Sequence, residues 1–223
     1  MIVSIHQPQY LPWIPYFSKI KQSNLFVVLD DVQYQKNGLQ NRNYIAGKNG
    51  QLRLTIPVSN NFGDAINIVK IADKKILRKH WQSIEMSYRK SVYFDEVAAA
   101  LKPIYFKEYE LLSMLNIDLI KCYLRYLEID TDVIISSTIS KYGEKSDLIL
   151  SICKELGATT YLTGSGGLEY LNVEEFRAAN IAIRLLEYHF KEYNQVNSNQ
   201  AFVQHLSLMD LVFNQGKNSV NFI

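Results

Sequence analysis

Residues 1–31, MIVSIHQPQYLPWIPYFSKIKQSNLFVVLDD, decide the fold prediction. Residues 1–5 form a short apolar run, and residues 11–22 can form a helix once the prolines are passed. Residues 24–31 form a continuous apolar run that ends in two carboxylates. A strand, a helix and a strand in this order make the crossover unit of a parallel sheet. The opening segment therefore predicts an α/β fold.

The rest of the chain extends this alternation around a helical middle. Residues 74–127 carry three helical patterns, in which Pro103 is expected to kink or end its helix. Residues 51–59 and 65–72, separated by NNFGD, predict a small antiparallel hairpin. Later strands are expected at 130–137, 159–164 and 181–190, and later helices at 145–158, ending at Gly157, at 168–180 and at 205–216.

We therefore predict a mostly parallel, Rossmann-like sheet with flanking helices, an all-helical middle segment and a small antiparallel hairpin. The sequence shows no repeat, low-complexity tract or linker. Residues 1–223 are accordingly expected to form a single α/β domain, with residues 74–127 as a helical insertion or cap.

The composition excludes several classes of protein. Lys and Arg number 24 against 22 Asp and Glu, so the net charge of +2 gives no basic excess for binding nucleic acid. Cys122 and Cys153 lie in amphipathic helical patterns without paired spacing, which predicts buried free thiols and a reducing, cytoplasmic location. No apolar stretch approaches a membrane span. The 15 Tyr and 10 Phe either enlarge the core or offer flat surfaces to ligand rings.

Ligands of open α/β sheets bind beyond the carboxyl ends of the strands, so the residues that follow each apolar run are the candidates. His6 is the first of them, as a general acid or base, with Gln7 beside it. The alternative is a neutral histidine hydrogen-bonded in the core. Pro8, Pro12 and Pro15 stiffen the following turn, which could hold Tyr10 and Trp13 over a pocket or simply cap the sheet.

Asp30 and Asp31 close the second predicted strand. Adjacent residues of a strand point to opposite faces, so the two carboxylates are not expected to act as a catalytic pair. One of them could bind a ribose hydroxyl, an ammonium group or a divalent cation, while a purely structural turn is the alternative. Arg42 and Asn43 follow in a loop-like stretch, where the Arg42 fork suits a phosphate or carboxylate unless it is merely solvated.

Two later strand ends complete the candidate set, with Ser137 after one strand and a glycine-rich turn after the next. That turn holds Thr163, Gly164, Ser165 and Gly166, and its amides could hold an anion at a helix start. A tight turn that needs positive backbone dihedrals is the alternative. No HxxxH, CxxC or HExxH spacing occurs, so a protein-held transition metal is not expected.

With these residues in view, the chain resembles the WbqC-like proteins of bacterial surface-polysaccharide (O-antigen) gene clusters. The matching segments run in order along nearly the whole length, from IHQPQYLPWIPYF and LDDVQYQKNGLQNRNYI to KHWQSIEMSY, GEKSDLILSICKELGATTYLTGSGGLEYL and SLMDLVFNQG. Where relatives typically have a Tyr-x-His-Pro-x-Tyr-like stretch, this chain has YHFKEYNQ. That departure leaves a role for His189 without support.

The resemblance implies work on amino sugars or other small glycan precursors. We expect a transferase that moves an acyl or aminoacyl group to the amine of a nucleotide-linked amino sugar, with catalytic His6 and Asp30. The expected partners are the nucleotide sugar and an activated acyl donor, and a homo-oligomer is compatible with the sequence. The alternatives are a non-catalytic carbohydrate- or nucleotide-binding protein and a nucleotidyl-transfer α/β enzyme. The sequence leaves open the cofactor, any need for Mg²⁺ and the identity of the donor and acceptor.

Overall fold

The computed structural model describes residues 1–196 and 202–223. The chain divides into two compact units. The first contains residues 1–7, 15–31 and 130–189, and the second contains residues 8–14, 32–129 and 190–223. Each unit is described by itself below. The expected helical segment lies inside the second unit, and the single-domain partition stays a prediction.

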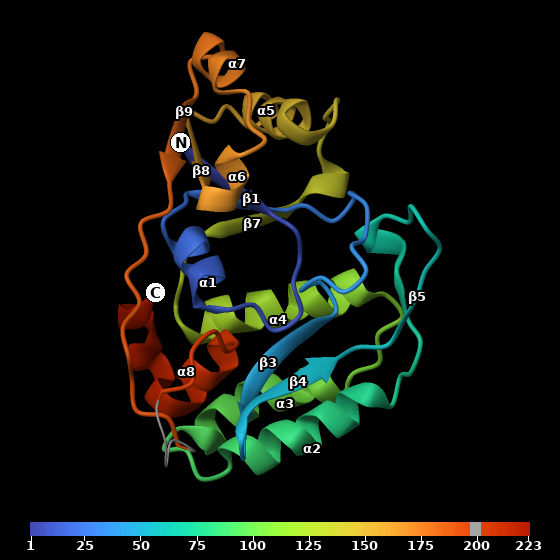
Figure 1. Ribbon diagram of the computed structural model, residues 1–223, viewed down its shortest axis with the longest axis vertical. Coiled ribbons are helices and arrows are strands. Elements are labelled where there is room, and N and C mark those ends of the chain that lie inside the picture. Colours follow the sequence, from blue (N-terminus) through green and yellow to red (C-terminus); the bar gives the residue numbers. More distant parts are fainter. Residues whose placement is uncertain (197–201) are drawn as a thin grey trace. The chain divides into compact units, whose positions relative to one another are not determined.

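The first unit is built on a five-stranded parallel sheet, as the opening segment predicts (Figure 1). Its strands, in the order β7-β2-β1-β8-β9, are β7 (Asp132–Ile135), β2 (Leu25–Val28), β1 (Ile2–His6), β8 (Thr160–Thr163) and β9 (Ala182–Leu185). Central strands of such a sheet are covered on both faces, which explains their unbroken apolar runs. The strand expected at 181–190 ends early, at Leu185.

Short helices connect these strands and cover the sheet. They are α1 (Ile14–Lys21), α5 (Lys145–Glu155), the single turn α6 (Ser165–Leu168) and α7 (Val173–Ala178), with the 3-10 turn η2 (Ser136–Thr138) after β7. Figure 1 shows α1 on one face of the sheet and α5 and α7 on the other. Gly157 follows α5 with a φ of 64°, the left-handed conformation expected of a glycine that ends a helix.

The strand order creates a topological switch beside β1. The chain passes from β1 to β2 on one side, and later returns to β8 on the other side of β1. Connections that leave in opposite directions open a crevice at the carboxyl ends of the two strands, where ligands of this kind of sheet bind. The residues that end β1 and β8 therefore flank the place where a ligand is expected.

The second unit is largely helical, as the pattern of residues 74–127 predicts. It contains α2 (Ile76–Tyr88), α3 (Phe94–Phe106), α4 (Leu112–Tyr126) and α8 (Leu208–Gln215), with the 3-10 turns η1 (Ile66–Ile68) and η3 (Gly216–Phe222). Pro103 lies inside the last turn of α3, which ends three residues later at Phe106, in line with the expected helix end.

The antiparallel part of the second unit differs in pairing from the expectation. Figure 1 shows the main ribbon, in which β4 (Gly50–Thr55) pairs with the preceding β3 (Arg42–Gly47). The expected partners meet only in the two-residue strands β5 (Val58–Ser59) and β6 (Lys70–Ile71). The reason is the turn at Lys48 and Asn49, after which Gly50 adopts a φ of 110°, because a two-residue turn with glycine closes a hairpin locally.

Aromatic rings fill the cores of both units. Tyr88 and Phe94 stack on Phe213 in the second unit, and Tyr161 stacks on Phe176 in the first. The largest fully buried side chains are mostly tyrosines and phenylalanines, while others, such as Phe62 and Tyr142, are exposed, so the aromatic residues serve both the core and the surface. Cys122 and Cys153 are buried free thiols, as predicted. Within residues 1–196 and 202–223, no helix has the length and apolar character needed to cross a bilayer.

Candidate functional site

Four strand ends meet at the carboxyl edge of the parallel sheet. His6 is the last residue of β1, Asp30 and Asp31 come shortly after β2, and η2 with Ser137 follows β7. Gly164 follows β8 directly. Since the strands are parallel neighbours, the nine predicted site residues of the first unit lie along one edge. These are His6, Gln7, Asp30, Asp31, Ser137, Thr163, Gly164, Ser165 and Gly166.

His6 is half-buried at the switch beside β8 and is held in one tautomer. Its Nδ1 lies 3.1 Å from the carbonyl oxygen of Gln7, which can only accept a hydrogen bond. Nδ1 of the neutral ring therefore carries the proton, and Nε2 has a free lone pair. Burial and the nearby charge of Lys19 lower the pKa of His6 to about 4, against the hydrogen bond to Gln7. The imidazole is thus neutral at pH 7.

Lys19 is a residue that the sequence reading missed. It lies on α1 with only 5% of its surface exposed, and its Nζ donates a hydrogen bond of 2.8 Å to the carbonyl oxygen of Ile5. Among the described residues it forms no ion pair. Burial lowers its pKa to about 7. The signal was the spacing of Tyr16, Lys19 and Ser23, which puts a lysine on the buried face of the helix.

The carboxylate of Asp30 is anchored on both oxygens. Its Oδ1 accepts hydrogen bonds from Ser136 Oγ and from the Ser137 amide, each at 3.0 Å, and its Oδ2 accepts one of 2.9 Å from Ser137 Oγ. The backbone amide of Asp30 donates in turn to Ser136 Oγ at 3.1 Å. This lock ties the end of β2 to the end of β7. It favours the structural alternative for Asp30, whose catalytic role stays a prediction.

Asp31 pairs with Lys141, which the sequence reading also missed. The two groups are 2.5 Å apart, and Lys141 donates to the carbonyl oxygen of Ser136 at 2.6 Å. Asp30 Oδ1 and Asp31 Oδ1 both lie within hydrogen-bond distance of the Ser136 hydroxyl and share its one proton, so the expectation that the two carboxylates point to opposite faces is wrong. The physical reason is that β2 ends at Val28, and the strand alternation does not extend to these residues.

The turn after β8 needs glycine for a reason other than positive backbone dihedrals. The left-handed residues of the chain do not include Gly164, Gly166 or Gly167, so the alternative of a turn with positive dihedrals is wrong. Gly167 is needed for close approach instead, because a Cβ there would overlap Thr163 Oγ1. Gly164 precedes α6, a helix of four residues whose dipole is small. Anion binding by this turn stays a prediction.

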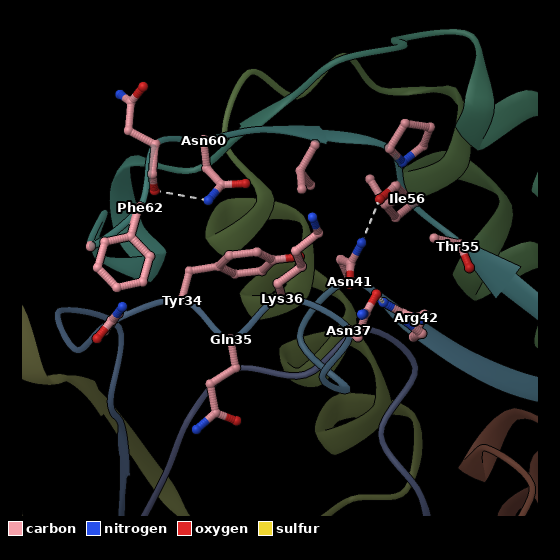
Figure 2. Close-up of a pocket in the computed structure, with 15 residues that line it drawn as sticks. Tyr34, Gln35, Lys36, Asn37, Asn41, Arg42, Thr55, Ile56, Asn60 and Phe62 are labelled. Atoms are coloured by element: carbon pink, nitrogen blue, oxygen red, sulfur yellow. Dashed lines mark hydrogen bonds between the residues drawn. The ribbon is translucent and has the colours of Figure 1, made fainter.

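The other four predicted residues belong to the second unit. Tyr10 is fully buried, and its hydroxyl lies 2.8 Å from His80 Nδ1, so Tyr10 is a residue of the core and not of a pocket wall. Asn43 is also buried and donates to the carbonyl oxygen of Leu11 at 2.6 Å. Trp13 is partly exposed, and its ring lies 6.3 Å from that of His205. Arg42 lines a cavity (Figure 2).

Metal ligation has no visible basis in the described residues. Residues 1–196 and 202–223 contain no group of three His, Cys, Asp or Glu side chains that could hold a metal ion. Asp30 and Asp31, the carboxylates considered for a divalent cation, are occupied by serine hydroxyls and by Lys141.

Two comparisons with known proteins found a match. The model of the WbqC-like protein family matches residues 7–222. Uncharacterized protein Rv1507c of Mycobacterium tuberculosis is 30% identical over 225 residues, which cover 99% of this chain and 96% of that protein. No solved structure matches the chain. The family match covers the switch residues after His6, the Asp30 lock and the Arg42 cavity, and the chain belongs to the WbqC-like protein family.

Proposed function

We propose that this protein transfers an acyl or aminoacyl group to the amine of a nucleotide-linked amino sugar. The observation that supports the proposal is the pair of weakly basic nitrogens beside the topological switch, the Nε2 of neutral His6 and the Nζ of Lys19. A nitrogen that is unprotonated at neutral pH, as His6 Nε2 is, suits the removal of a proton from an attacking amine, whereas Lys19 is about half protonated at pH 7. The family membership adds the expectation of a glycan precursor as acceptor.

In the proposed reaction His6 acts as general base. The amine nitrogen of the sugar attacks the acyl carbon of a thioester or ester, a C–N bond forms, and His6 Nε2 takes the proton that the nitrogen loses. The C–S or C–O bond then breaks, and the imidazolium returns the proton to the leaving group. Atoms and charge balance with the activated acyl donor as the only co-reactant.

Lys19 is proposed as a positioning residue that acts through His6. A charged Lys19 opposes the protonation of His6, since the two charges repel, and a neutral Lys19 relieves this opposition. The rate should therefore rise as pH passes the Lys19 pKa of about 7. Replacement by methionine keeps the bulk of the side chain and removes the titration.

The test is product formation measured by mass spectrometry. The intact protein is incubated with UDP-glucosamine and, in separate reactions, acetyl-coenzyme A, a longer acyl-coenzyme A or a glycyl thioester. We expect the mass of an N-acylated sugar with at least one donor. His6→Gln should lower kcat about 10²- to 10⁴-fold with KM nearly unchanged, which is the usual contribution of a general base.

The matched control is His189→Gln, which replaces an exposed histidine of the same unit and should leave kcat unchanged. Lys19→Met should retain turnover but lose the rise of rate near pH 7. If no donor yields product while the sugar nucleotide binds the wild type and His6→Gln equally well, the protein is a binding module and the transferase proposal fails.

A further inference from the structure

A cavity of about 790 Å³ opens within the second unit. It is lined by the loop after Val32, the start of β3, and the segment from the end of β4 to Gly63. Figure 2 shows the ring of Tyr34 between Phe62 and Asn41 in this view. The volume falls in the range of natural small-molecule sites, about 300 to 1,000 Å³.

The charge of the cavity wall has one sign. Its lining residues include two cations, Lys36 and Arg42, and no aspartate or glutamate. The positive charge of Arg42 reaches the Tyr34 hydroxyl, where it offsets part of the rise in pKa that burial causes. A pocket with two cations and no anion attracts a negatively charged ligand.

Only one of two adjacent hydrogen-bond donors on the Arg42 guanidinium has a partner among the described residues. Nε and Nη2 of a guanidinium lie side by side and together fit the two oxygens of a phosphate or carboxylate. In this structure Nη2 donates to Asn37 Oδ1, and Nε is buried without a hydrogen-bond partner among the described residues. The single amide oxygen of Asn37 thus fills one of two adjacent donor positions. An oxyanion that displaced it would fill both.

A ligand could displace the Asn37 side chain from Arg42 Nη2 without disturbing the fold. It lies at an exposed loop position with a φ of 70°, the left-handed region in which asparagine is tolerated and glycine is favoured. The exchange of Asn37 for a ligand therefore requires no rearrangement of a strand. Replacement by glycine removes the amide oxygen without adding backbone strain.

The rest of the wall suits hydroxyl groups and a sugar ring. Asn41 is 5% exposed and donates to the carbonyl oxygen of Ile56 at 2.8 Å, while its Oδ1 has no partner among the described residues. Asn60 adds a second amide at the rim, and Phe62 is fully exposed, so its ring is available to pack on a ligand. Amides that pair with hydroxyls and an aromatic face are the usual means of holding a saccharide.

We propose that this cavity binds a sugar that carries a phosphate or carboxylate group, with the oxyanion on Nε and Nη2 of Arg42 in place of Asn37. Lys36 adds attraction at the rim, and the amides and Phe62 hold the ring. This site goes beyond the proposed acyl transfer, because its ligand is defined by the Arg42 edge and its occupation needs no acyl donor.

The experiment measures binding by saturation-transfer NMR and calorimetry at low ionic strength, with no acyl donor present. The probes are glucose 1-phosphate, glucuronate and glucose, which separate a phosphate, a carboxylate and an uncharged ring. We expect the two anionic sugars to bind and glucose to bind about tenfold more weakly or not at all, since the charge-assisted pair is missing. Inorganic phosphate should compete with glucose 1-phosphate.

Four variants locate the site. Arg42→Gln and Arg42→Lys should each weaken glucose 1-phosphate binding about tenfold, since lysine keeps the charge but loses the paired geometry. Asn37→Gly should tighten it a few-fold, because the competing amide oxygen is gone. Arg53→Gln is the matched control, since Arg53 is an exposed arginine of β4 outside the cavity lining, and it should bind like wild type.

Each result decides for or against the site. Equal binding of all three sugars, no binding by the wild type, or equal losses in Arg42→Gln and Arg53→Gln overturns it. Should an Arg42 variant fail to fold by circular dichroism, Asn37→Gly and a fifth variant, Lys36→Gln, carry the same decision. Glucose 1-phosphate should bind more tightly to the first and more weakly to the second, because Lys36→Gln removes a cation of the cavity lining. Arg42-dependent binding by a wild-type protein that forms no product with any donor rules out only the transferase. Turnover without Arg42-dependent binding rules out only this site.

Discussion

Lys19 Nζ donates a hydrogen bond of 2.8 Å to the carbonyl oxygen of Ile5, and this bond joins the buried face of α1 to the central strand β1. The bond satisfies one of the three protons of the ammonium group and neutralises none of its charge. Below pH 7, burial of the Lys19 cation beside His6 therefore lowers the free energy of unfolding, at the edge of the sheet where ligands of this fold bind. We expect the removal of this charge to stabilise the protein and to alter its function.

Lys19→Met should stabilise the protein at pH 6. The fall of the Lys19 pKa from 10.5 to about 7 corresponds to a penalty on the order of 5 kcal/mol below pH 7. The lost hydrogen bond is worth about 1.5 to 3 kcal/mol, so the net gain should be about 2 to 3.5 kcal/mol. Because the unfolded chain binds the extra proton between pH 7 and 10.5, wild-type stability rises with pH across that window.

The measurement is urea unfolding of both proteins at pH 6, 8 and 10.5. The advantage of Lys19→Met should shrink as pH rises and should vanish or reverse at pH 10.5, where folded Lys19 is neutral and the unfolded side chain is only half protonated, so the penalty is almost gone. An advantage that stays constant with pH would show that the methionine acts through packing alone.

His80 should make the protein sensitive to acid. Burial lowers its pKa to about 4, and its Nδ1 lies 2.8 Å from the Tyr10 hydroxyl. Between pH 6.5 and 4 the unfolded chain binds a proton that folded His80 does not, so the free energy of unfolding falls as the pH is lowered, by up to about 1.4 kcal/mol per pH unit from this group. His80→Gln should remove that part of the slope, at the cost of packing.

The check compares the free energy of unfolding at pH 6.5 and 4.5 for wild type, His80→Gln and the exposed control His189→Gln. Burial also lowers the pKa of His6 to about 4, so His6 should contribute to the loss of stability in acid in the same way as His80.

NMR of the histidine ring protons should show the rings of His6 and His80 neutral at pH 5.5. A ring that titrates near pH 6.5 would contradict the burial argument for that residue.

The parallel sheet was predictable because its information is local. Each strand is an apolar run, each connection is a nearby helix, and handedness leaves few ways to arrange them. The place of His6 and Asp30 at strand ends follows from the same pattern. By contrast, the low pKa of Lys19 depends on the dehydration of one helix face, and the Tyr10–His80 contact joins residues 70 positions apart. Helical spacing places Lys19 on the buried face of α1, but the size of the pKa shift and the partner of Tyr10 depend on packing that spacing and composition do not specify.

The pairing of β3 with β4 is a second feature that could not be predicted from the sequence. The alternation of residues 51–59 is compatible with pairing to the segment before it or to the segment after it. The two-residue turn at Lys48 and Asn49 selects the earlier segment, because closing it orders fewer residues than closing the loop at 60–64. The pairing also carries Arg42 into the cavity wall. A reading of the sequence could therefore nominate Arg42 by its chemistry, while its binding edge and its partner Asn37 came only from the fold.

Asp30→Asn should destabilise the first unit by about 2 to 4 kcal/mol. The amide keeps one acceptor and turns the other into a donor, so at least one charge-assisted bond from Ser136 or Ser137 is lost and a donor is left facing donors. Asp132→Asn, at the exposed start of β7, is the control and should change the unfolding free energy by less than about 0.5 kcal/mol.

Unfolding in urea separates the two interpretations of Asp30. A loss of stability with turnover retained assigns the carboxylate to the lock between β2 and β7. Wild-type stability with turnover abolished would instead support the catalytic role that the sequence suggested.

Gly216→Ala should be among the most damaging single changes in the second unit. Gly216 ends α8 with a φ of 56° and a ψ of −141°, a combination that side chains rarely adopt. A Cβ there would also overlap Cδ1 of the Tyr93 ring, and a ring carbon cannot move aside as a flexible chain end does. Strain and overpacking, about 1 to 3 kcal/mol each, predict a total loss of about 2 to 6 kcal/mol.

Gly50→Ala is the matched control, because Gly50 has a φ of 110° but nothing lies within 4 Å of the position that an alanine methyl group would take. It isolates the strain, and the difference between the two variants gives the cost of the contact with Tyr93. Tyr93→Ala added to Gly216→Ala should recover part of that difference in a double-mutant cycle. Equal unfolding free energies for Gly50→Ala and Gly216→Ala would mean that the ring is not what excludes a side chain at the end of α8.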